Sequence, residues 1–189
     1  ILGSAAFAFP VGIMSGIYMN EYAPKGKLVR FIRMMTNNLS GIPSIVFGLF
    51  GMALFVNKLS FGDSILAGSL TLALLSLPLV IRTTEEALPM ALPNITPGLI
   101  LAVGRVSGET APILFTCAAY FLPQLPSGVL DQCMALPYHL YVLATSGTDL
   151  ELQRPIAYGT ALVLIVIVLL VNITATLVRR YFANKVKMN

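Results

Sequence analysis

Two charged residues, Arg105 and Glu109, stand four positions apart in a stretch that is otherwise mostly apolar or small. On a helix, residues at this spacing share one face and their side chains can meet. Either charge costs about 2.5–3.5 kcal/mol at the centre of a bilayer on insertion scales, so neither side chain is expected to face lipid. The spacing therefore predicts a polar helix face that looks into a helix bundle or onto a water-filled path.

Two interpretations of this charged pair remain open. The guanidinium fork of Arg105 matches a tetrahedral oxyanion, so the pair can form a polar binding site on the path of an anion. Ser107 and Thr110 are further candidate residues of this site. Alternatively, the pair is a static ion pair that holds helices together, because Glu109 repels an anion unless Arg105 shields it or it is protonated. The residue types alone favour neither interpretation.

Catalytic chemistry has little support in the sequence. Ser107 lacks the flanking glycines of a nucleophile elbow, and the only histidine, His139, is far away in the chain. The sequence contains no HExxH motif. Cys117 and Cys133 have no CxxC partner, so they are interpreted as small apolar fillers, although they can pair with each other. We therefore expect no catalytic residues, no metal site and no cofactor in the chain itself.

The composition indicates what must hold these residues in place. Of 189 residues, 57% are hydrophobic and 11% are charged, whereas soluble domains carry roughly 25% charged residues. A helix needs about 20 mostly apolar residues to cross the hydrocarbon core. The sequence predicts an all-α membrane protein, a polytopic transmembrane helix bundle that forms a single domain over residues 1–189. Its five spans are expected at about 1–20, 40–57, 64–81, 96–122 and 155–178.

The distribution of basic residues predicts the orientation of the spans. Of twelve Lys and Arg residues, nine fall in the connectors 21–39 and 82–95 or in the C-terminal tail, and two fall in the connectors on the other side. Positively charged connectors stay in the cytoplasm. The loop 82–95 and the C-terminus are therefore expected inside the cell, and the segment 123–154 outside. With an odd number of spans Ile1 lies outside, so we expect a further helix upstream of it.

The external segment 123–154 is too long for a simple turn. Its mostly apolar part is broken by Pro137, so it is expected to lie along the outer interface or to dip back into it; an irregular loop is the alternative. In the second and fourth spans, small residues at four-residue steps indicate close helix packing. These residues are Ser40, Ser44 and Gly48, and Gly104 and Gly108.

Four runs, in order along most of the chain, carry a resemblance to a known family. They read EYAPKG at 21–26, NLSGIPSIVFGLFG at 38–51, LVIRTTEE at 79–86 and GRVSGETAP at 104–112. Together they resemble the permease of the phosphate-specific ABC importers, the PstA type, and the last run is the most specific. The segment from Leu136 to Thr145 is also similar to the external part of that family.

The resemblance implies a six-helix permease that pairs with a second, similar permease in the bacterial inner membrane, surrounded by lipid. It also implies two cytoplasmic ATPase subunits, which bind ATP and magnesium, and an extracytoplasmic phosphate-binding protein. No nucleic acid is expected among the partners. In such importers ATP hydrolysis on the partners switches the permease between outward and inward openings, so this chain would supply the path for phosphate.

The resemblance also implies a segment that couples the permease to the ATPase. The residues that match it are Arg82, Thr84, Glu85, Glu86 and Pro93. The family has a longer loop with a glycine between the last two positions, which this sequence lacks. Either the middle of the loop is deleted or residues are omitted from the given sequence; we expect omission, because the family's first helix is also missing.

Two other functions stay open. One is a path for a different oxyanion, such as sulfate or molybdate, since an intramembrane arginine suits many anions. The other is a passive channel or a structural membrane subunit that needs no ATPase. The two charges in the fourth span are compatible with both.

Overall fold

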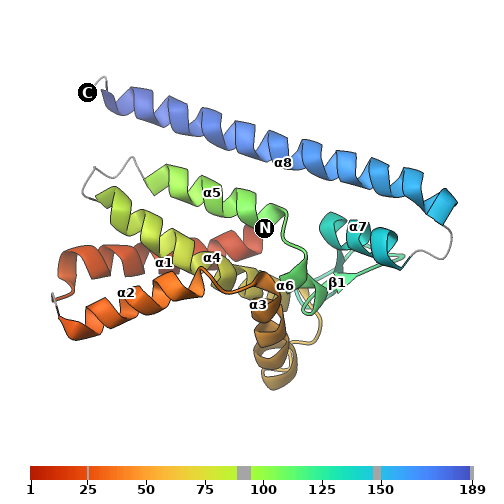
Figure 1. Cartoon of the computed structure of the whole chain (residues 1–189), viewed down its shortest axis with the longest axis horizontal. Coiled ribbons are helices and arrows are strands. Elements are labelled where there is room, and N and C mark those ends of the chain that lie inside the picture. The colour runs from red at the N-terminus through yellow and green to blue at the C-terminus, as the bar shows by residue number, and fades with distance from the viewer. Residues whose placement is uncertain (25, 89–94, 147–149, 188–189) are drawn as a thin grey trace.

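The computed structural model describes residues 1–24, 26–88, 95–146 and 150–187, and these are almost entirely helical (Figure 1). One pair of two-residue parallel strands lies between the helices. The elements are α1 (Leu2–Ile17), the π-helical turn η1 (Tyr18–Tyr22), α2 (Lys27–Leu39), α3 (Ser44–Gly51), the π-helical segment η2 (Met52–Lys58), α4 (Ile65–Ala87), α5 (Ile95–Ser107), α6 (Ala111–Leu114), β1 (Ala118–Ala119), β2 (Cys133–Met134), α7 (Leu136–Thr145) and α8 (Leu150–Lys187).

Three helical stretches are long and apolar enough to cross a membrane: Leu2–Tyr22, Ile65–Ala87 and Gln153–Thr174. A fourth crossing results if α2 and the segment Ser44–Lys58, which meet at 103°, form one broken span. The prediction of an all-α membrane protein with several spans is confirmed. Five spans are not confirmed, because the described residues supply three or four. The helix expected upstream of Ile1 stays a prediction.

Two predicted spans differ from the observed helices. The span predicted at 40–57 starts inside a break, and α2, which was expected to be a loop, is helical. The span predicted at 96–122 is not one helix, because α5 ends at Ser107 and only the four-residue α6 follows. Gly108 favours a turn, and Pro112 lies at the start of α6, where its missing N–H costs nothing. The predicted loop 82–95 is also partly helical, since α4 continues to Ala87.

Helices α1 and α4 form the most extensive helix–helix contact among the described residues. Small residues at four-residue steps line the buried side of α1: Ser4, Ala8, Gly12 and Gly16. A Cβ atom built on Gly12 would lie 2.5 Å from Cγ1 of Val80, and one on Gly16 would lie 2.7 Å from Cβ of Thr84. The contacts advance along both helices together, so α1 and α4 run parallel with their backbones nearly touching.

The first turn of α4 is fixed by the segment that follows α6. Ser64 caps the helix by accepting a hydrogen bond from the Ala67 N–H at 3.2 Å. The N–H of Ser64 donates to the carbonyl of Thr116, and the N–H of Ile65 donates to the carbonyl of Asp131, both at 2.8 Å. N–H groups at the start of the helix therefore find acceptors in a segment more than 50 residues away in the sequence.

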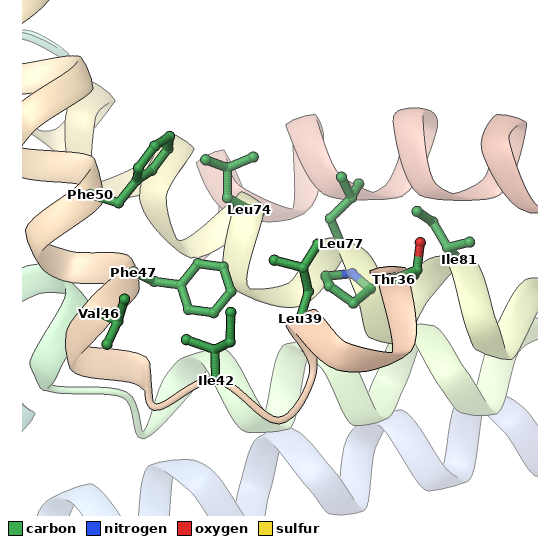
Figure 2. Close-up of a pocket in the computed structure, with 10 residues that line it drawn as sticks. Thr36, Leu39, Ile42, Val46, Phe47, Phe50, Leu74, Leu77 and Ile81 are labelled. Atoms are coloured by element: carbon green, nitrogen blue, oxygen red, sulfur yellow. The ribbon is translucent and has the colours of Figure 1, made fainter. Parts of the chain in front are cut away.

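The bend between α2 and α3 leaves an apolar hollow of about 340 Å³ against α4 (Figure 2). Phe47 and Phe50 come from α3, and Leu74 and Leu77 come from α4. Thr36 is the one residue with a polar side chain among those that line the hollow. The break itself falls at Ser40–Pro43, where the proline cannot continue the α2 hydrogen-bond ladder.

The ends of the helices sort to two sides of the bundle. In Figure 1 the end of α4, the start of α5 and the C-terminus lie on the left, and α7 and β1 lie on the right. Arg33 joins α2 to the ends of α4 and η1 on the left side, through Glu85 and Met19. The end of α4 and the C-terminal end of α8, both predicted to be cytoplasmic, therefore share one side of the molecule, and α7, within the segment predicted to be external, lies on the other.

Candidate translocation site

The charged pair lies where α5 ends. The N–H of Gly108 donates to the carbonyl of Arg105, and the N–H of Glu109 donates to the carbonyl of Val106, both at 3.3 Å, so the chain leaves the helix in a tight turn. Across this turn Nε of Arg105 lies 3.4 Å from Oε1 of Glu109. The predicted meeting of the two side chains is confirmed, but they are held together by a helix end and not by a continuous helix.

Glu109 lines a cavity of about 340 Å³ that is separate from the hollow of Figure 2. The cavity is walled by α4, the end of α5, the strand pair and α8, and most of its lining residues are apolar. The side chain of Glu109 is 17% exposed and that of Arg105 is 37% exposed. The guanidinium thus remains accessible to solvent while the carboxylate is largely withdrawn into the cavity, an arrangement that places the positive charge outermost.

Ser107 and Thr110, the other two predicted pathway residues, differ in what they offer. Ser107 also lines the cavity, but its hydroxyl donates to the carbonyls of Val103 at 2.8 Å and Gly104 at 3.0 Å. Its O–H is therefore engaged by the helix and does not face an anion. Thr110 is half-buried at the residue before α6, and its hydroxyl has no hydrogen-bond partner among the described contacts. Thr110 is the better donor of the two.

The predicted small-residue contacts are partly present. A Cβ on Gly104 would meet Oδ1 of Asn172 at 2.5 Å, so α5 packs closely against α8 there. A Cβ on Gly108 would find nothing within 4 Å. Gly48 approaches the carbonyl of Ala111 at 2.8 Å, which brings α3 against α6. Gly104 and Gly48 thus position the cavity-lining segment, whereas Gly108 serves the turn.

The residues implied as the coupling segment lie at the end of α4. Arg82 and Glu86 form an exposed ion pair at 2.8 Å. Glu85 instead pairs with Arg33 of α2 at 3.0 Å. Thr84 is buried against Gly16 and donates to the carbonyl of Val80, so it does not offer its side chain to a partner protein. Pro93 lies outside the described residues.

Arg33 is a residue that the sequence reasoning missed. Its Nε pairs with Glu85, and its Nη2 donates to the carbonyl of Met19 at 2.9 Å, so one side chain joins α2, α4 and η1. A basic residue in a positively charged connector is ordinarily interpreted as a topology signal alone. Its position beside the coupling segment links α2 to the end of α4.

Reversing one charge of this link is expected to loosen the bundle, and exchanging both charges is expected to restore it. Arg33→Glu or Glu85→Arg places like charges about 3 Å apart, so each should lower the free energy of unfolding by about 0.5–1 kcal/mol at this half-exposed position. The double variant regains most of the loss. Thermal unfolding of the purified protein measures the effect, with Arg82→Glu in the fully exposed pair as the control. Equal loss in the double variant would contradict the link.

Comparison with known proteins identifies relatives of the chain. No protein-family model matches the sequence. The chain is 34% identical over 205 residues to the probable ABC transporter permease protein YqgI of Bacillus subtilis, covering 88% of this chain and 69% of that protein. It is 34% identical over 213 residues to the phosphate transport system permease protein PstA of Yersinia pestis, covering 98% and 69%. It is 32% identical over 204 residues to PstA 1 of Mycobacterium tuberculosis strain CDC 1551 / Oshkosh, covering 93% and 66%.

The chain is a bundle of apolar helices, and it is similar to ABC permeases over most of its length. It is therefore an ABC transporter permease, a multi-pass membrane protein. Within that class it belongs to the PstA family. The chain spans about two thirds of the length of these relatives. The family resemblance read from the four sequence runs is thereby confirmed.

Proposed function

We propose that this chain forms part of the path by which inorganic phosphate crosses the inner membrane in an ATP-driven importer. The observation that carries the proposal is the contact of Arg105, whose side chain is 37% exposed, with Glu109, whose side chain is 17% exposed and lines a mostly apolar cavity. A phosphate oxyanion can take the place of Glu109 on the guanidinium, because a planar fork binds tetrahedral oxyanions through two parallel hydrogen bonds.

The arrangement favours a pathway role over a static ion pair. A structural ion pair inside a membrane protein is expected to be buried and fully hydrogen-bonded, because an unpaired charge there is costly. Here the two groups touch through one 3.4 Å contact, and the guanidinium has exposed N–H groups left over. Such a pair can open to admit an anion at low cost. The choice of inorganic phosphate as the substrate is based on the relatives that are named phosphate transport system permease proteins.

The complete importer is proposed to contain a second permease of this type, two cytoplasmic ATPases that bind ATP and magnesium, and an extracytoplasmic phosphate-binding protein. The left side of Figure 1, with the end of α4 and the C-terminus, would face the cytoplasm because the basic connectors lie there. Among the coupling residues that the structure describes, the exposed pair of Arg82 and Glu86 is proposed to contact the ATPase.

Uptake of labelled phosphate by the assembled complex in proteoliposomes tests this function. We expect uptake to require ATP on the cytoplasmic side and to be reduced by excess unlabelled phosphate, with little effect of sulfate or molybdate. Equal competition by sulfate or molybdate would identify a different oxyanion as the substrate. Uptake without ATP, from a protein that purifies without an ATPase, would instead support a passive channel and refute the importer.

A further inference from the structure

Two cysteines from separate segments come together beside the proposed path. Cys117 lies in the turn after α6 and Cys133 opens β2. The N–H of Cys133 donates to the carbonyl of Cys117 at 3.1 Å, and the parallel register pairs Ala118 with Cys133. Neighbouring strands lie about 4.8 Å apart, and a disulfide spans Cα separations of about 4.4–6.8 Å. The backbone therefore holds the two residues at a distance that a disulfide can bridge.

The side chains of the two cysteines face the same space. Both line the cavity that holds Glu109. Each thiol acts on the other, which lowers the pKa of Cys133 and raises that of Cys117. Cys117 is only 5% exposed, within a core cluster that also contains Leu72 and Ile113, whereas Cys133 is half-buried. One sulfur is thus accessible to an oxidant, and the other is positioned behind it.

The segments that carry the cysteines are anchored and not left as free loops. Thr116, next to Cys117, accepts a hydrogen bond from the N–H of Ser64, and Asp131, two residues before Cys133, accepts one from Ile65. The carboxylate of Asp131 also accepts from the N–H groups of Ser127 and Gly128 at 2.8 and 2.9 Å. These hydrogen bonds therefore tie the backbone near each cysteine to the same first turn of α4.

We propose that Cys117 and Cys133 form an intramolecular disulfide on the extracytoplasmic side of the permease. The site lies at the end of the molecule that carries α7, and its exposure to an oxidising compartment rests on the orientation given under the proposed function. The bond covalently closes the segment 117–133 at the wall of the cavity. It would fix that wall relative to α4 and α6, where Glu109 is held.

The chemistry requires a disulfide-bearing protein oxidant or a small disulfide. The Cys133 thiolate attacks one sulfur of the oxidant, which forms a mixed disulfide and releases one thiolate. The Cys117 thiol, on losing its proton, then attacks the Cys133 sulfur and displaces the second thiol of the oxidant. Two protein thiols are oxidised to one disulfide, and the oxidant's disulfide is reduced to two thiols. One leaving thiolate takes the proton of Cys117, and the other takes from water the proton that Cys133 lost on ionising.

Thiol counting in native membranes tests this proposal. Cells that contain the complete importer, with any cysteine of the permease outside residues 1–189 replaced by serine, are quenched in acid. The denatured permease is then treated with a maleimide-bearing polymer that adds visible mass per free thiol. We expect no adduct without reductant and two adducts after reduction. The variants Cys117→Ser and Cys133→Ser should each give one adduct under both conditions, which shows that no third partner is involved.

Two adducts without reductant would overturn the proposal. Repeating the measurement after oxidising the membranes with copper phenanthroline distinguishes the two possible reasons for free thiols: a reducing compartment, or cysteines that are too far apart. Rapid loss of both adducts would mean that the cysteines are close but lie in a reducing compartment, which refutes the orientation and leaves phosphate uptake itself untouched. Two remaining adducts would refute the geometry. A ladder of cross-linked dimers in place of a closed monomer would equally contradict an intramolecular bond.

Discussion

The variant Arg105→Leu is expected to lose phosphate uptake while the protein still inserts and assembles. Leucine removes the guanidinium that would bind the anion and leaves Glu109 facing the cavity without its partner. Hydrogen bonds to charged groups contribute roughly 1.5–3 kcal/mol each, and each 1.4 kcal/mol is about a tenfold effect. Uptake of labelled phosphate at low external concentration should therefore fall by about 10- to 100-fold.

Three further variants make this result interpretable. Arg105→Lys keeps the charge but not the fork, so uptake should recover in part. Glu109→Gln removes the competing carboxylate, and we expect phosphate binding to persist. Arg154→Leu, an exposed arginine in the first turns of α8, is the matched control and should transport normally. Normal uptake by Arg105→Leu, at wild-type levels of protein in the membrane, would refute the pathway role and leave a purely structural ion pair.

Substitution of Gly12 by leucine is expected to have the largest effect on stability. A Cβ at this position already lies 2.5 Å from Cγ1 and 2.8 Å from Cβ of Val80, so a longer side chain must push α1 away from α4. Forcing extra methylene groups into a packed contact typically costs about 1–3 kcal/mol. We expect a lower thermal unfolding midpoint in detergent and a smaller folded fraction on size exclusion.

The chain offers both a control and a compensating variant for this test. Gly159 lies in α8, and a Cβ there would meet nothing within 4 Å, so Gly159→Leu should leave the unfolding midpoint nearly unchanged. The smaller change Gly12→Ala should be partly rescued by Val80→Ala, which removes the atom it meets. If Gly12→Leu and Gly159→Leu behave alike, close contact between α1 and α4 is not what stabilises this pair of helices.

Composition and periodic spacing were sufficient to predict the class of fold and the charged pair. Long apolar stretches can only form helices in a bilayer, because each backbone N–H and C=O must be satisfied within its own segment. The predicted stretches at 1–20, 64–81 and 155–178 accordingly coincide with helices. The contact between Arg105 and Glu109 also followed from the spacing, since four residues bring two side chains together on a helix and across its terminal turn alike.

The differences arise where local backbone chemistry outweighs hydropathy. Hydropathy averaged over 96–122 gives no sign that α5 ends just before Gly108 or that α6 begins next to Pro112. The basic residues of 21–39 likewise led to the prediction of a loop there, whereas Lys27–Leu39 forms α2, which meets the segment Ser44–Lys58 at 103°. The stripe of small residues in α1 was not predicted, although its members stand at four-residue steps in the sequence. Its partner on α4 could not be predicted, because only the tertiary arrangement decides which helix faces it.

The pairing of α1 with α4 has a consequence for how the permease changes shape. With Gly12 and Gly16 set directly against the side chains of Val80 and Thr84, there is no spare room between the two helices at these positions, so they cannot slide past each other without collision. In the proposed importer, a change between outward and inward openings would therefore move α1 and α4 together as one unit.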